Sequence, residues 1–183
     1  DTAHLNVLTI EDPVEYQLPD IGQIHVRPKI GLTFAQGLRH ILRQDPDVIL
    51  VGETRDRETA EIMIRAALTG HLVFSTLHTN DAPGAITRLI DMGVEPFLVA
   101  SAVKAIVAQR LVRRLCNYCK RPVAASMEVQ ALMARQGAIT QPLTSPVYEK
   151  AGCTECHGTG YSGRIALMEL CEINAELRDL IEQ

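Results

Sequence analysis

Tryptophan is absent from the 183-residue sequence, and Phe and Tyr together make up only 4% of it. Any hydrophobic core must therefore be built mostly from Ile, Leu, Val, Ala and Met. Positive charge is also scarce, since 18 Lys and Arg against 22 Asp and Glu leave a net charge of −4. This balance excludes a strongly basic nucleic-acid footprint. The shortage of aromatic rings also removes the stacking platforms that single-stranded nucleic acid needs.

Long apolar runs are missing too, and none approaches the roughly 20 residues that span a bilayer. The N-terminus has neither the charged nor the apolar region of a signal peptide. The sequence begins with Asp rather than Met, so we expect a piece of a longer protein whose ends say little about compartment. Its length fits one ordinary domain with a small satellite, and 46% apolar with 22% charged residues is an ordinary globular balance.

Strand-like and helix-like segments alternate over the first two-thirds of the chain. Apolar and β-branched runs predict strands over residues 5–10, 23–26, 47–51 and 71–77. Helical periodicity predicts helices over residues 34–42, 57–69 and 81–93. Such alternation is typical of βαβ units, so we predict an α/β fold with a mostly parallel sheet flanked by helices.

Capping signals locate several helix ends. The run from Thr33 to Gln36 has the form of a capping box, and Gly70 is placed to end the next helix. Asn174 is placed to cap a last helix with Leu177, Leu180 and Ile181 on its apolar side, after a strand over residues 164–173. We expect a loop over residues 136–146. A helix is also predicted to continue up to the first Cys pair, because the apolar residues of this stretch keep helical spacing. These residues are Val99, Val103, Ile106, Val107 and Leu111.

Acidic or histidine-bearing loops follow three of the predicted strands. They begin at Glu11-Asp12, at Gly52-Glu53 and at His78. In parallel sheets, functional groups collect beyond the carboxyl ends of the strands, so we expect these loops to share one rim. The apolar strand that delivers Glu53 has the Walker B arrangement, in which a carboxylate holds Mg²⁺ beside a nucleotide's phosphates. Taken singly, each loop is better explained without catalysis, as a surface carboxylate, a solvated acidic turn or a structural histidine.

Together the three segments form a specific set, because TIEDPVEY, RQDPDVILVGETRD and TGHLVFSTLHTND occur in this order at compact spacing. The set resembles the Asp box, Walker B segment and His box of the secretion ATPase superfamily. The similarity is to the type II secretion (E component) and type IV pilus assembly ATPases, and it extends from Leu5 to the C-terminal helix. It implies a partial RecA-like core and the hydrolysis of ATP with Mg²⁺.

The resemblance also implies roles for individual residues. Glu11 matches the glutamate expected to act as general base or to position water, with Asp12 beside it as a secondary candidate. Glu53 matches the Walker B glutamate beside Mg²⁺, and His78 matches the residue that senses or contacts phosphate. His71, at the other end of its strand, has a structural or interface role. Four cations are candidates to reach a neighbouring subunit's nucleotide: Arg27, Lys29, Arg39 and Arg43.

One element of the family is missing, namely the Gly-rich phosphate loop G-x-x-x-x-G-K-[ST]. In the family it lies upstream of the position that Leu5 occupies here, and it supplies backbone N–H groups and a lysine to the phosphates. We therefore expect the isolated chain to bind ATP poorly and not to turn it over. Since the family usually continues beyond the position of Gln183, we also expect the C-terminus to be incomplete.

Four of the five cysteines form two C-x-x-C pairs separated by 33 residues, namely Cys116 with Cys119 and Cys153 with Cys156. Four thiolates complete a tetrahedral, closed structural Zn²⁺ site. Two alternatives stay open, because the second pair followed by His157 matches c-type haem attachment, and either pair matches a redox motif. Cys171 is predicted to be an apolar filler. Within the family, assembly and export ATPases carry such a tetracysteine subdomain, whereas retraction ATPases generally lack it.

These features divide the chain into three parts. Residues 1–112 form the RecA-like ATPase core, residues 113–160 the zinc-binding subdomain, and residues 161–183 a strand and helix that return to the core. The resemblance implies a cytoplasmic homo-hexamer held peripherally at the inner membrane by a platform protein and a cytoplasmic adaptor. It implies neither nucleic-acid binding nor membrane insertion. The function it implies is ATP hydrolysis that drives pseudopilus or pilus assembly and protein export in type II secretion. Two alternatives stay open, namely a type IV pilus assembly ATPase and a non-catalytic, zinc-stabilised docking module.

Overall fold

The computed structural model describes residues 2–138, 140–141 and 144–183, and the chain divides into two compact units. The first unit comprises residues 1–108 and 168–183, and the second comprises residues 109–167. None of the helices in these described ranges is long and apolar enough to cross a membrane.

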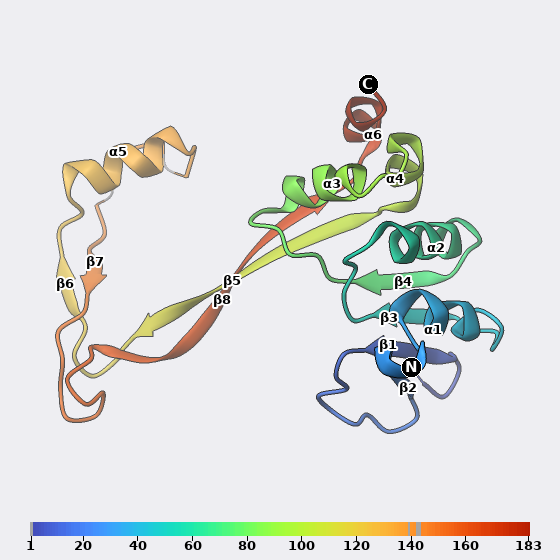
Figure 1. Cartoon of the computed structure of the whole chain (residues 1–183). Helices are drawn as coiled ribbons and strands as arrows, with labels where there is room; N and C mark the ends of the chain where they lie inside the picture. Colours follow the sequence, from blue (N-terminus) through green and yellow to red (C-terminus); the bar gives the residue numbers. More distant parts are fainter. Residues whose placement is uncertain (1, 139, 142–143) are drawn as a thin grey trace. The chain divides into compact units, whose positions relative to one another are not determined.

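The first unit is built on a parallel sheet with the strand order β2-β1-β3-β4 (Figure 1). The strands are β1 (Val7–Glu11), β2 (Gly22–His25), β3 (Val48–Val51) and β4 (Leu72–Ser75). All three neighbouring pairs run parallel, which confirms the predicted α/β fold. The register pairs Ile10 with Val51 and Val51 with Ser75, so the carboxyl ends of three strands lie side by side.

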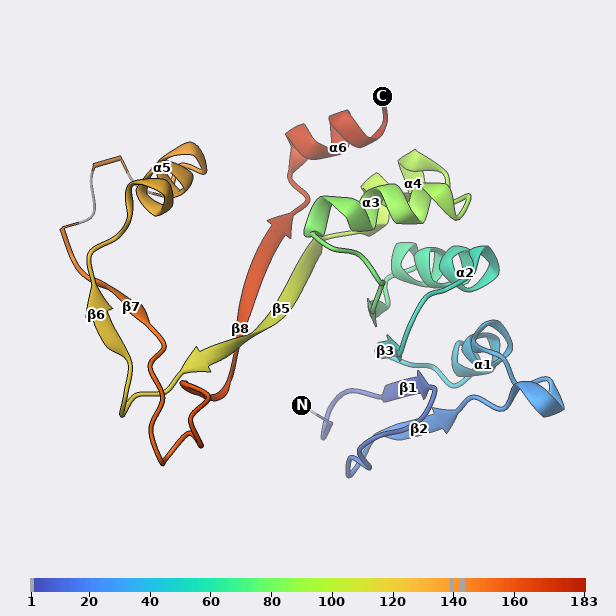
Figure 2. The ribbon, with the colours of Figure 1, turned by 60° about the vertical axis from the view of Figure 1, so that its left-hand side comes forward.

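One face of this sheet packs against α1 (Phe34–Ile41) and α2 (Arg57–Leu68), which also pack against each other (Figure 2). Alternation along the strands sends every second apolar side chain into this layer. The buried side chains there include Ile10, Leu38, Ile41, Ile49, Val51 and Met63. The short 3₁₀ helix η1 (Pro28–Ile30) precedes α1.

Side-chain caps begin these helices where the sequence predicts. The Thr33 hydroxyl accepts a hydrogen bond from the backbone N–H of Gln36 at 3.2 Å, and the Asp56 carboxylate accepts one from the N–H of Thr59 at 2.9 Å. Each cap satisfies a donor that has no partner within the helix. Gly70 follows α2 with a positive φ of 106°, the left-handed conformation in which glycine ends a helix.

A second apolar cluster of the first unit lies between α2 and the remaining helices. These are α3 (Ala82–Asp91), α4 (Pro96–Ala102) and α6 (Ala175–Ile181). Asn174 caps α6 as predicted, because its Oδ1 accepts a hydrogen bond from the N–H of Leu177 at 2.9 Å. Leu177, Ile181 and Cys171 pack against this cluster. The prediction for Leu180 is wrong, since this side chain is 65% exposed.

The predicted helix up to the first Cys pair is also wrong beyond residue 102. The chain leaves α4 and forms the strand β5 (Ala105–Leu115), which pairs with β8 (Tyr161–Glu172) in a two-stranded sheet. Pairing with a distant segment therefore overrides the helical spacing, and the β-branched residues of this stretch favour a strand. β8 itself confirms the strand predicted over residues 164–173.

The second unit holds a further strand pair and one helix that the sequence did not predict. Strands β6 (Arg121–Val123) and β7 (Val147–Glu149) run antiparallel. Helix α5 (Met127–Arg135) begins at Ser126, whose hydroxyl accepts a hydrogen bond from the N–H of Val129. In the predicted loop, residues 136–138, 140–141 and 144–146 have neither helix nor strand, while residues 139 and 142–143 lie outside the described residues.

Candidate functional site

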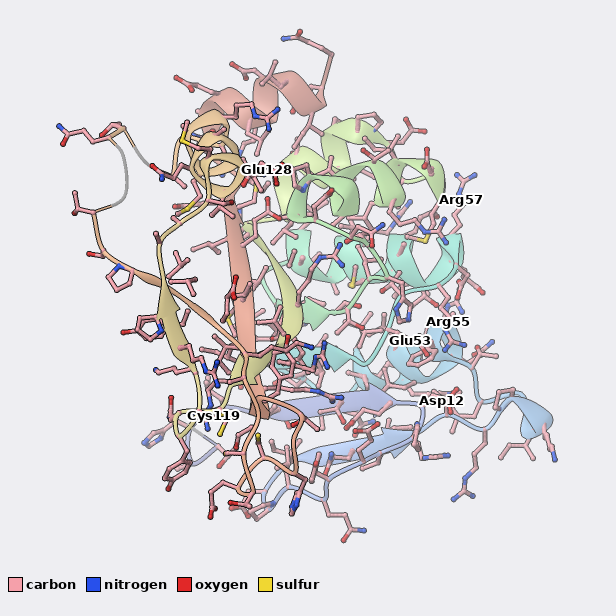
Figure 3. The ribbon with its side chains drawn as sticks, turned by 90° about the vertical axis from the view of Figure 1, so that its left-hand side faces the viewer. Asp12, Glu53, Arg55, Arg57, Cys119 and Glu128 are labelled. Carbon is pink, nitrogen blue, oxygen red and sulfur yellow. The ribbon has the colours of Figure 1, made fainter. Side chains whose placement is uncertain are left out.

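A groove of about 440 Å³ lies at the carboxyl edge of the parallel sheet. The segments that follow β1, β3 and β4 all contribute to it, so the structure brings Glu11, Glu53 and His78 together at one rim. Asp12 lines the same groove, and it is labelled with Glu53 and Arg55 in Figure 3. The complete lining is Glu11, Asp12, Pro13, Glu15, Tyr16, Gly52, Glu53, Arg55, Thr76 and His78.

Glu53 is the most enclosed carboxylate of this groove, with only 9% of its surface exposed. Its Oε2 accepts a hydrogen bond from Nε of Arg55, and it lies 3.3 Å from Nε2 of His78. The His78 side chain is 83% exposed. A buried charge is stable only when it is paired and hydrogen-bonded, and Arg55 supplies that pairing here. The imidazole of His78 is therefore the most exposed of these three side chains and is accessible to a ligand in the groove.

Hydrogen bonds between the loops after β3 and β4 place His78 near Glu53. The Thr54 N–H donates to the carbonyl of Thr76 at 3.0 Å. In return, the hydroxyl of Thr76 donates to the carbonyl of Gly52 at 2.6 Å. These bonds continue the parallel pairing beyond the ends of the two strands. The two loops are consequently held together where their functional side chains begin.

Glu11 occupies the end of β1 and is held differently from Glu53. Its Oε1 accepts two hydrogen bonds, one from the hydroxyl of Thr9 at 2.6 Å and one from Nε2 of Gln23 at 2.9 Å. Gly52 lies against the backbone of this residue. A Cβ atom added at Gly52 would lie 3.2 Å from Cα of Glu11 and 3.2 Å from the carbonyl oxygen of Ile10. Glycine at position 52 therefore permits the close approach of the two strand ends.

The charges of the groove are unequal, because four carboxylates face one guanidinium. The carboxylates belong to Glu11, Asp12, Glu15 and Glu53, and the guanidinium to Arg55. Carboxylate oxygens are the ligands that Mg²⁺ prefers, and this ion is commonly held by one or two carboxylates together with waters, so Glu53 alone is a candidate to hold it. The four carboxylates do not converge on one point, since the cysteines are the only such group of three or more ligands among the described residues. The same charges repel a bare polyphosphate. A nucleotide at this rim thus needs a divalent cation and further positive groups to offset the carboxylates.

The other predicted site residues lie outside the groove. His71 has a structural environment, since its Nδ1 lies 2.9 Å from the carbonyl oxygen of Ala66 and 3.2 Å from the hydroxyl of Thr69. Arg39 forms an ion pair of 2.6 Å with Glu58. The three other candidate cations are exposed: Arg27, Lys29 and Arg43.

Sequence reasoning missed four residues that shape the groove, namely Thr9, Gln23, Arg55 and Thr76. Thr9 could have been found, because it lies two residues before Glu11 in the same strand and so points to the same side. Arg55 lies two residues after Glu53 in the loop that follows β3, close enough along the chain to be a candidate partner. Gln23 carries no such local signal. Its contact with Glu11 depends on the pairing of β2 with β1, which the sequence alone does not specify.

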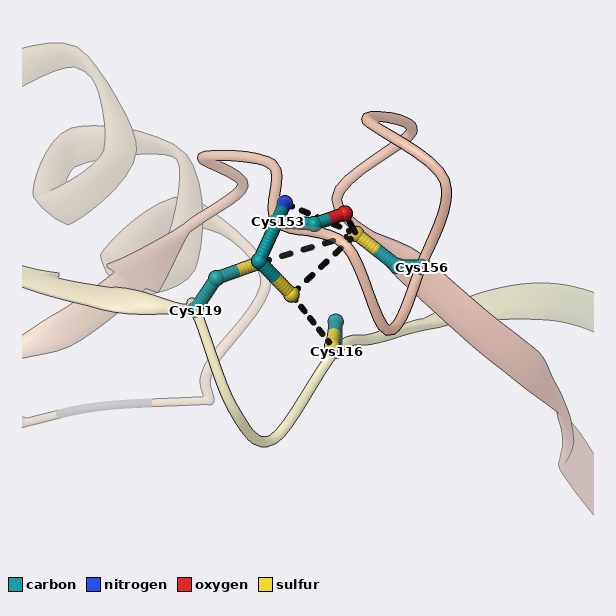
Figure 4. A group of neighbouring side chains, drawn as sticks. All are labelled: Cys116, Cys119, Cys153 and Cys156. Atoms are coloured by element: carbon teal, nitrogen blue, oxygen red, sulfur yellow. Dashed lines mark hydrogen bonds between the residues drawn. The ribbon is translucent and has the colours of Figure 1, made fainter.

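The four paired cysteines form a second site, within the second unit (Figure 4). Their sulfur atoms all lie within 4.8 Å of one another. Three of the separations are 4.0 Å (Cys116 to Cys153), 3.8 Å (Cys119 to Cys156) and 3.7 Å (Cys153 to Cys156). Four zinc–sulfur bonds of about 2.3 Å in a tetrahedron place the sulfurs about 3.8 Å apart. The donor set therefore fits a closed zinc site.

The backbone around Cys156 supports a negative sulfur. Burial alone would raise the pKa of this thiol, but the N–H groups of Cys153 and Gly160 donate to its sulfur and lower the pKa to about 6. Burial raises the pKa of Cys119 to about 11. Because both C-x-x-C pairs meet at one point, the geometry favours a shared metal over haem attachment, which would leave the first pair unexplained.

The model of the type II/IV secretion system protein family matches residues 1–183. The chain belongs to this family. It is 55% identical over 177 residues to the type II secretion system protein E of Pseudomonas aeruginosa, covering 96% of this chain and 34% of that protein. It is 51% identical to the type IV pilus assembly ATPase PilB of Myxococcus xanthus, covering 96% and 31%. The chain thus spans about a third of the length of these curated members of the type II/IV secretion family.

Solved structures agree with this assignment. The pilus retraction motor PilT with bound ADP superimposes with a TM-score of 0.66 at 30% identity, covering 97% of this chain and 41% of PilT. The Legionella pneumophila ATPase DotB has a TM-score of 0.61 at 23% identity, covering 97% and 39%, and it shows the shared fold alone. The family assignment confirms the resemblance that the Asp-box, Walker B and His-box segments indicated.

Proposed function

We propose that this chain is the C-terminal ATPase segment of a type II secretion motor. The whole protein would hydrolyse ATP to ADP and phosphate, and this reaction would drive pseudopilus assembly and protein export. The observation that carries the proposal is the convergence of Glu11, Glu53 and His78 in one groove at the carboxyl edge of a parallel sheet. A family assignment alone does not make a fragment catalytic, whereas this arrangement places a candidate base, a candidate Mg²⁺ ligand and an imidazole beside one another, as phosphoryl transfer to water requires in addition to a phosphate loop.

In this proposal Glu11 accepts the proton of the attacking water or orients it toward the γ-phosphate. Glu53 holds Mg²⁺ directly or through water, and Mg²⁺, when bound, neutralises charge on the phosphates. His78 contacts the γ-phosphate. Its exposed ring and its proximity to the buried Glu53 support this role, because a shift of the ring toward a phosphate needs no change in the core. Arg55 stabilises the carboxylate of Glu53.

The phosphate loop would come from a part of the protein outside this chain, so we propose that the isolated chain is inactive. The acidic character of the groove supports this, since a nucleotide requires more positive charge than Arg55 provides. In a homo-hexamer the cations Arg27, Lys29, Arg39 and Arg43 would serve a neighbouring subunit's nucleotide. An arginine supplied in this way contributes about 10³–10⁵ in rate. Arg39 would have to leave Glu58 to do so.

The cysteine cluster would hold one structural Zn²⁺ through Cys116, Cys119, Cys153 and Cys156. Such a site would stabilise a unit in which strands β6 and β7 and helix α5 are all short. We further propose that the whole protein is cytoplasmic and associates with the inner membrane through a platform protein and a membrane adaptor.

Sequence identity does not separate type II secretion from pilus assembly, because type II secretion E proteins are 50–55% identical to this chain and PilB is 51% identical. Genetic complementation separates the two. The full-length gene is expected to restore secretion in a strain lacking its type II ATPase and not to restore pili in a strain lacking its pilus assembly ATPase. Restoration of pili alone would assign the protein to pilus assembly.

Two carboxylate substitutions test the activity itself. In the full-length protein, Glu11→Gln and Glu53→Gln are expected to lower Mg²⁺-dependent ATP hydrolysis at least a hundredfold, in the range of general base catalysis. Glu61→Gln is the matched control, since Glu61 lies outside the groove in an ion pair with Arg57. Unchanged hydrolysis in both groove variants would mean that this groove is not the catalytic site, and this chain would then be better described as a non-catalytic docking module stabilised by zinc.

A further inference from the structure

We infer that Thr9 and Gln23 are positioning residues that fix the carboxylate of Glu11 for proton transfer. This inference rests on the proposed function of Glu11. It concerns the two hydrogen bonds that end on Oε1 of Glu11, from the Thr9 hydroxyl and the Gln23 amide. Among the residues that the structure describes, the Thr9 hydroxyl and the Gln23 amide are the donors that hold the Glu11 carboxylate in place.

Thr9 is built into the sheet so that its hydroxyl has little freedom. It lies two residues before Glu11 in β1, so both side chains leave the same face of the strand. It is only 3% exposed, and a β-branched side chain has a restricted χ1 angle. The 2.6 Å contact with Oε1 therefore comes from a donor whose position is set by the backbone of β1.

Gln23 reaches the same oxygen from the neighbouring strand. It is paired with Thr9 in the parallel register of β1 and β2. Its Oε1 accepts a hydrogen bond from the N–H of Leu18 at 2.8 Å, and its Nε2 donates to the carbonyl of Tyr16 at 3.0 Å. A flipped amide would set oxygen against oxygen at Tyr16 and at Glu11. The network therefore fixes the amide with Nε2 toward Glu11.

Both donors hold the same carboxylate oxygen, which has a chemical consequence. Oε1 is occupied by two hydrogen bonds, so Oε2 is the oxygen left to accept a proton from water. A general base must lie within about 2.6–3.2 Å of the proton's parent atom. Because Oε1 is held by two hydrogen bonds, Oε2 is fixed at one position and faces the water from one direction. This position matters, since a misplacement of reacting groups by about 1 Å can lower the rate a hundredfold.

Gln23 also couples this carboxylate to the loop that forms one wall of the groove. Tyr16, whose carbonyl is bound by Gln23, lines the groove together with Asp12 and Glu15. A displacement of the loop that carries Tyr16 would therefore move the Gln23 amide and, with it, the carboxylate of Glu11.

Substitutions in the full-length enzyme test the inference. Gln23→Met and Thr9→Val remove the donors with little change of size, and each is expected to lower kcat about 10- to 100-fold while the KM for ATP changes less than about twofold. Thr9→Ser keeps a hydroxyl and is expected to retain most of kcat. The control is Gln36→Met, because Gln36 is exposed on α1 outside the groove. Should Gln23→Met not fold, Gln23→Asn keeps an amide too short to reach Glu11, and the same loss of kcat is expected.

A second readout separates positioning from general weakening of the fold. In a Glu11→Gln background, Gln23→Met and Thr9→Val are expected to lower the residual rate no further, because the group that they position is already lost. Normal kcat in both variants, with Glu11→Gln inactive, would overturn the inference and leave the proposed function intact. An active Glu11→Gln enzyme would instead overturn the proposed function.

Discussion

The Nε2 atom of His78 lies 3.3 Å from the Oε2 atom of Glu53, although the two residues are 25 positions apart in the sequence. Both follow strands of the same parallel sheet, β3 and β4, whose register pairs Val51 with Ser75. Two hydrogen bonds extend that register into the loops, one from the Thr54 N–H to the carbonyl of Thr76 and one from the Thr76 hydroxyl to the carbonyl of Gly52. The proximity of an imidazole and a carboxylate is thus a direct result of how two βα units are aligned.

The two histidines that flank β4, His71 before it and His78 after it, are expected to behave differently when replaced by alanine. His78 is exposed at the groove, so His78→Ala should reduce ATP hydrolysis by the full-length protein about 10- to 100-fold, the range for a lost hydrogen bond to a charged group. His71 instead bonds to the C-terminal end of α2, so His71→Ala should lower the free energy of unfolding by about 0.5–1.5 kcal/mol. Rate assays and thermal unfolding of both variants check this. Equal effects of the two variants on kcat would contradict the division of roles.

Gly52→Ala is expected to impair catalysis more than stability. The added Cβ would press on Cα of Glu11 and the carbonyl of Ile10 at 3.2 Å, so the backbone that carries Glu11 must move by a few tenths of an ångström. A shift of this kind at a proposed base should lower kcat about tenfold or more. Steady-state kinetics of the full-length variant measure it. A normal kcat would mean that the position of Glu11 has no such influence on the rate.

Gly37→Ala tests the packing of α1 on the sheet. A Cβ atom at this position would lie well inside van der Waals contact distance of Cδ1 of Ile10, so that core side chain must shift. Overpacking of this kind costs about 1–3 kcal/mol. Scanning calorimetry of the full-length protein should show a lower unfolding temperature than for the exposed control Gln36→Ala. An unchanged unfolding temperature would show that the core adapts without cost.

Much of the fold was predictable because local signals and burial agree. The four strands of the parallel sheet alternate or run apolar, and Thr33 and Asn174 cap helices where their sequence context indicates. The stretch over Val103–Leu111 was predicted wrongly, because its helical spacing competes with pairing to β8, a partner about 60 residues away in the chain. Local periodicity carries no information about such a partner.

The candidate site follows the same pattern. Glu11, Glu53 and His78 could be predicted to share a rim, because parallel strands bring their carboxyl ends to one edge. Gln23 could not be predicted, since its contact with Glu11 depends on which strand pairs with β1 and in which register. A structural or interface role for His71 was predicted, but its partner was not. Its hydrogen bond to the carbonyl of Ala66 depends on how α2 ends, which the sequence does not specify.

The cysteine cluster predicts one zinc ion per chain. Elemental analysis of the full-length protein should give an equimolar content, and the Cys116→Ser/Cys153→Ser double variant should lose it, because two ligands cannot close a tetrahedral shell. Loss of zinc should also make the second unit more sensitive to proteolysis, since binding energy at such sites contributes to folding. Cys171→Ser is the matched control, as Cys171 lies outside the cluster. A metal-free, fully folded wild-type protein would contradict the zinc site.

The most direct test of the proposed catalytic site is a crystal structure of the full-length protein with Mg²⁺ and a non-hydrolysable ATP analogue. We expect the γ-phosphate at the rim beyond β1, β3 and β4, with an ordered water within about 2.6–3.2 Å of Glu11. Glu53 should lie on the metal side and His78 beside the phosphate. A triphosphate bound elsewhere, with these three side chains facing solvent, would contradict the account.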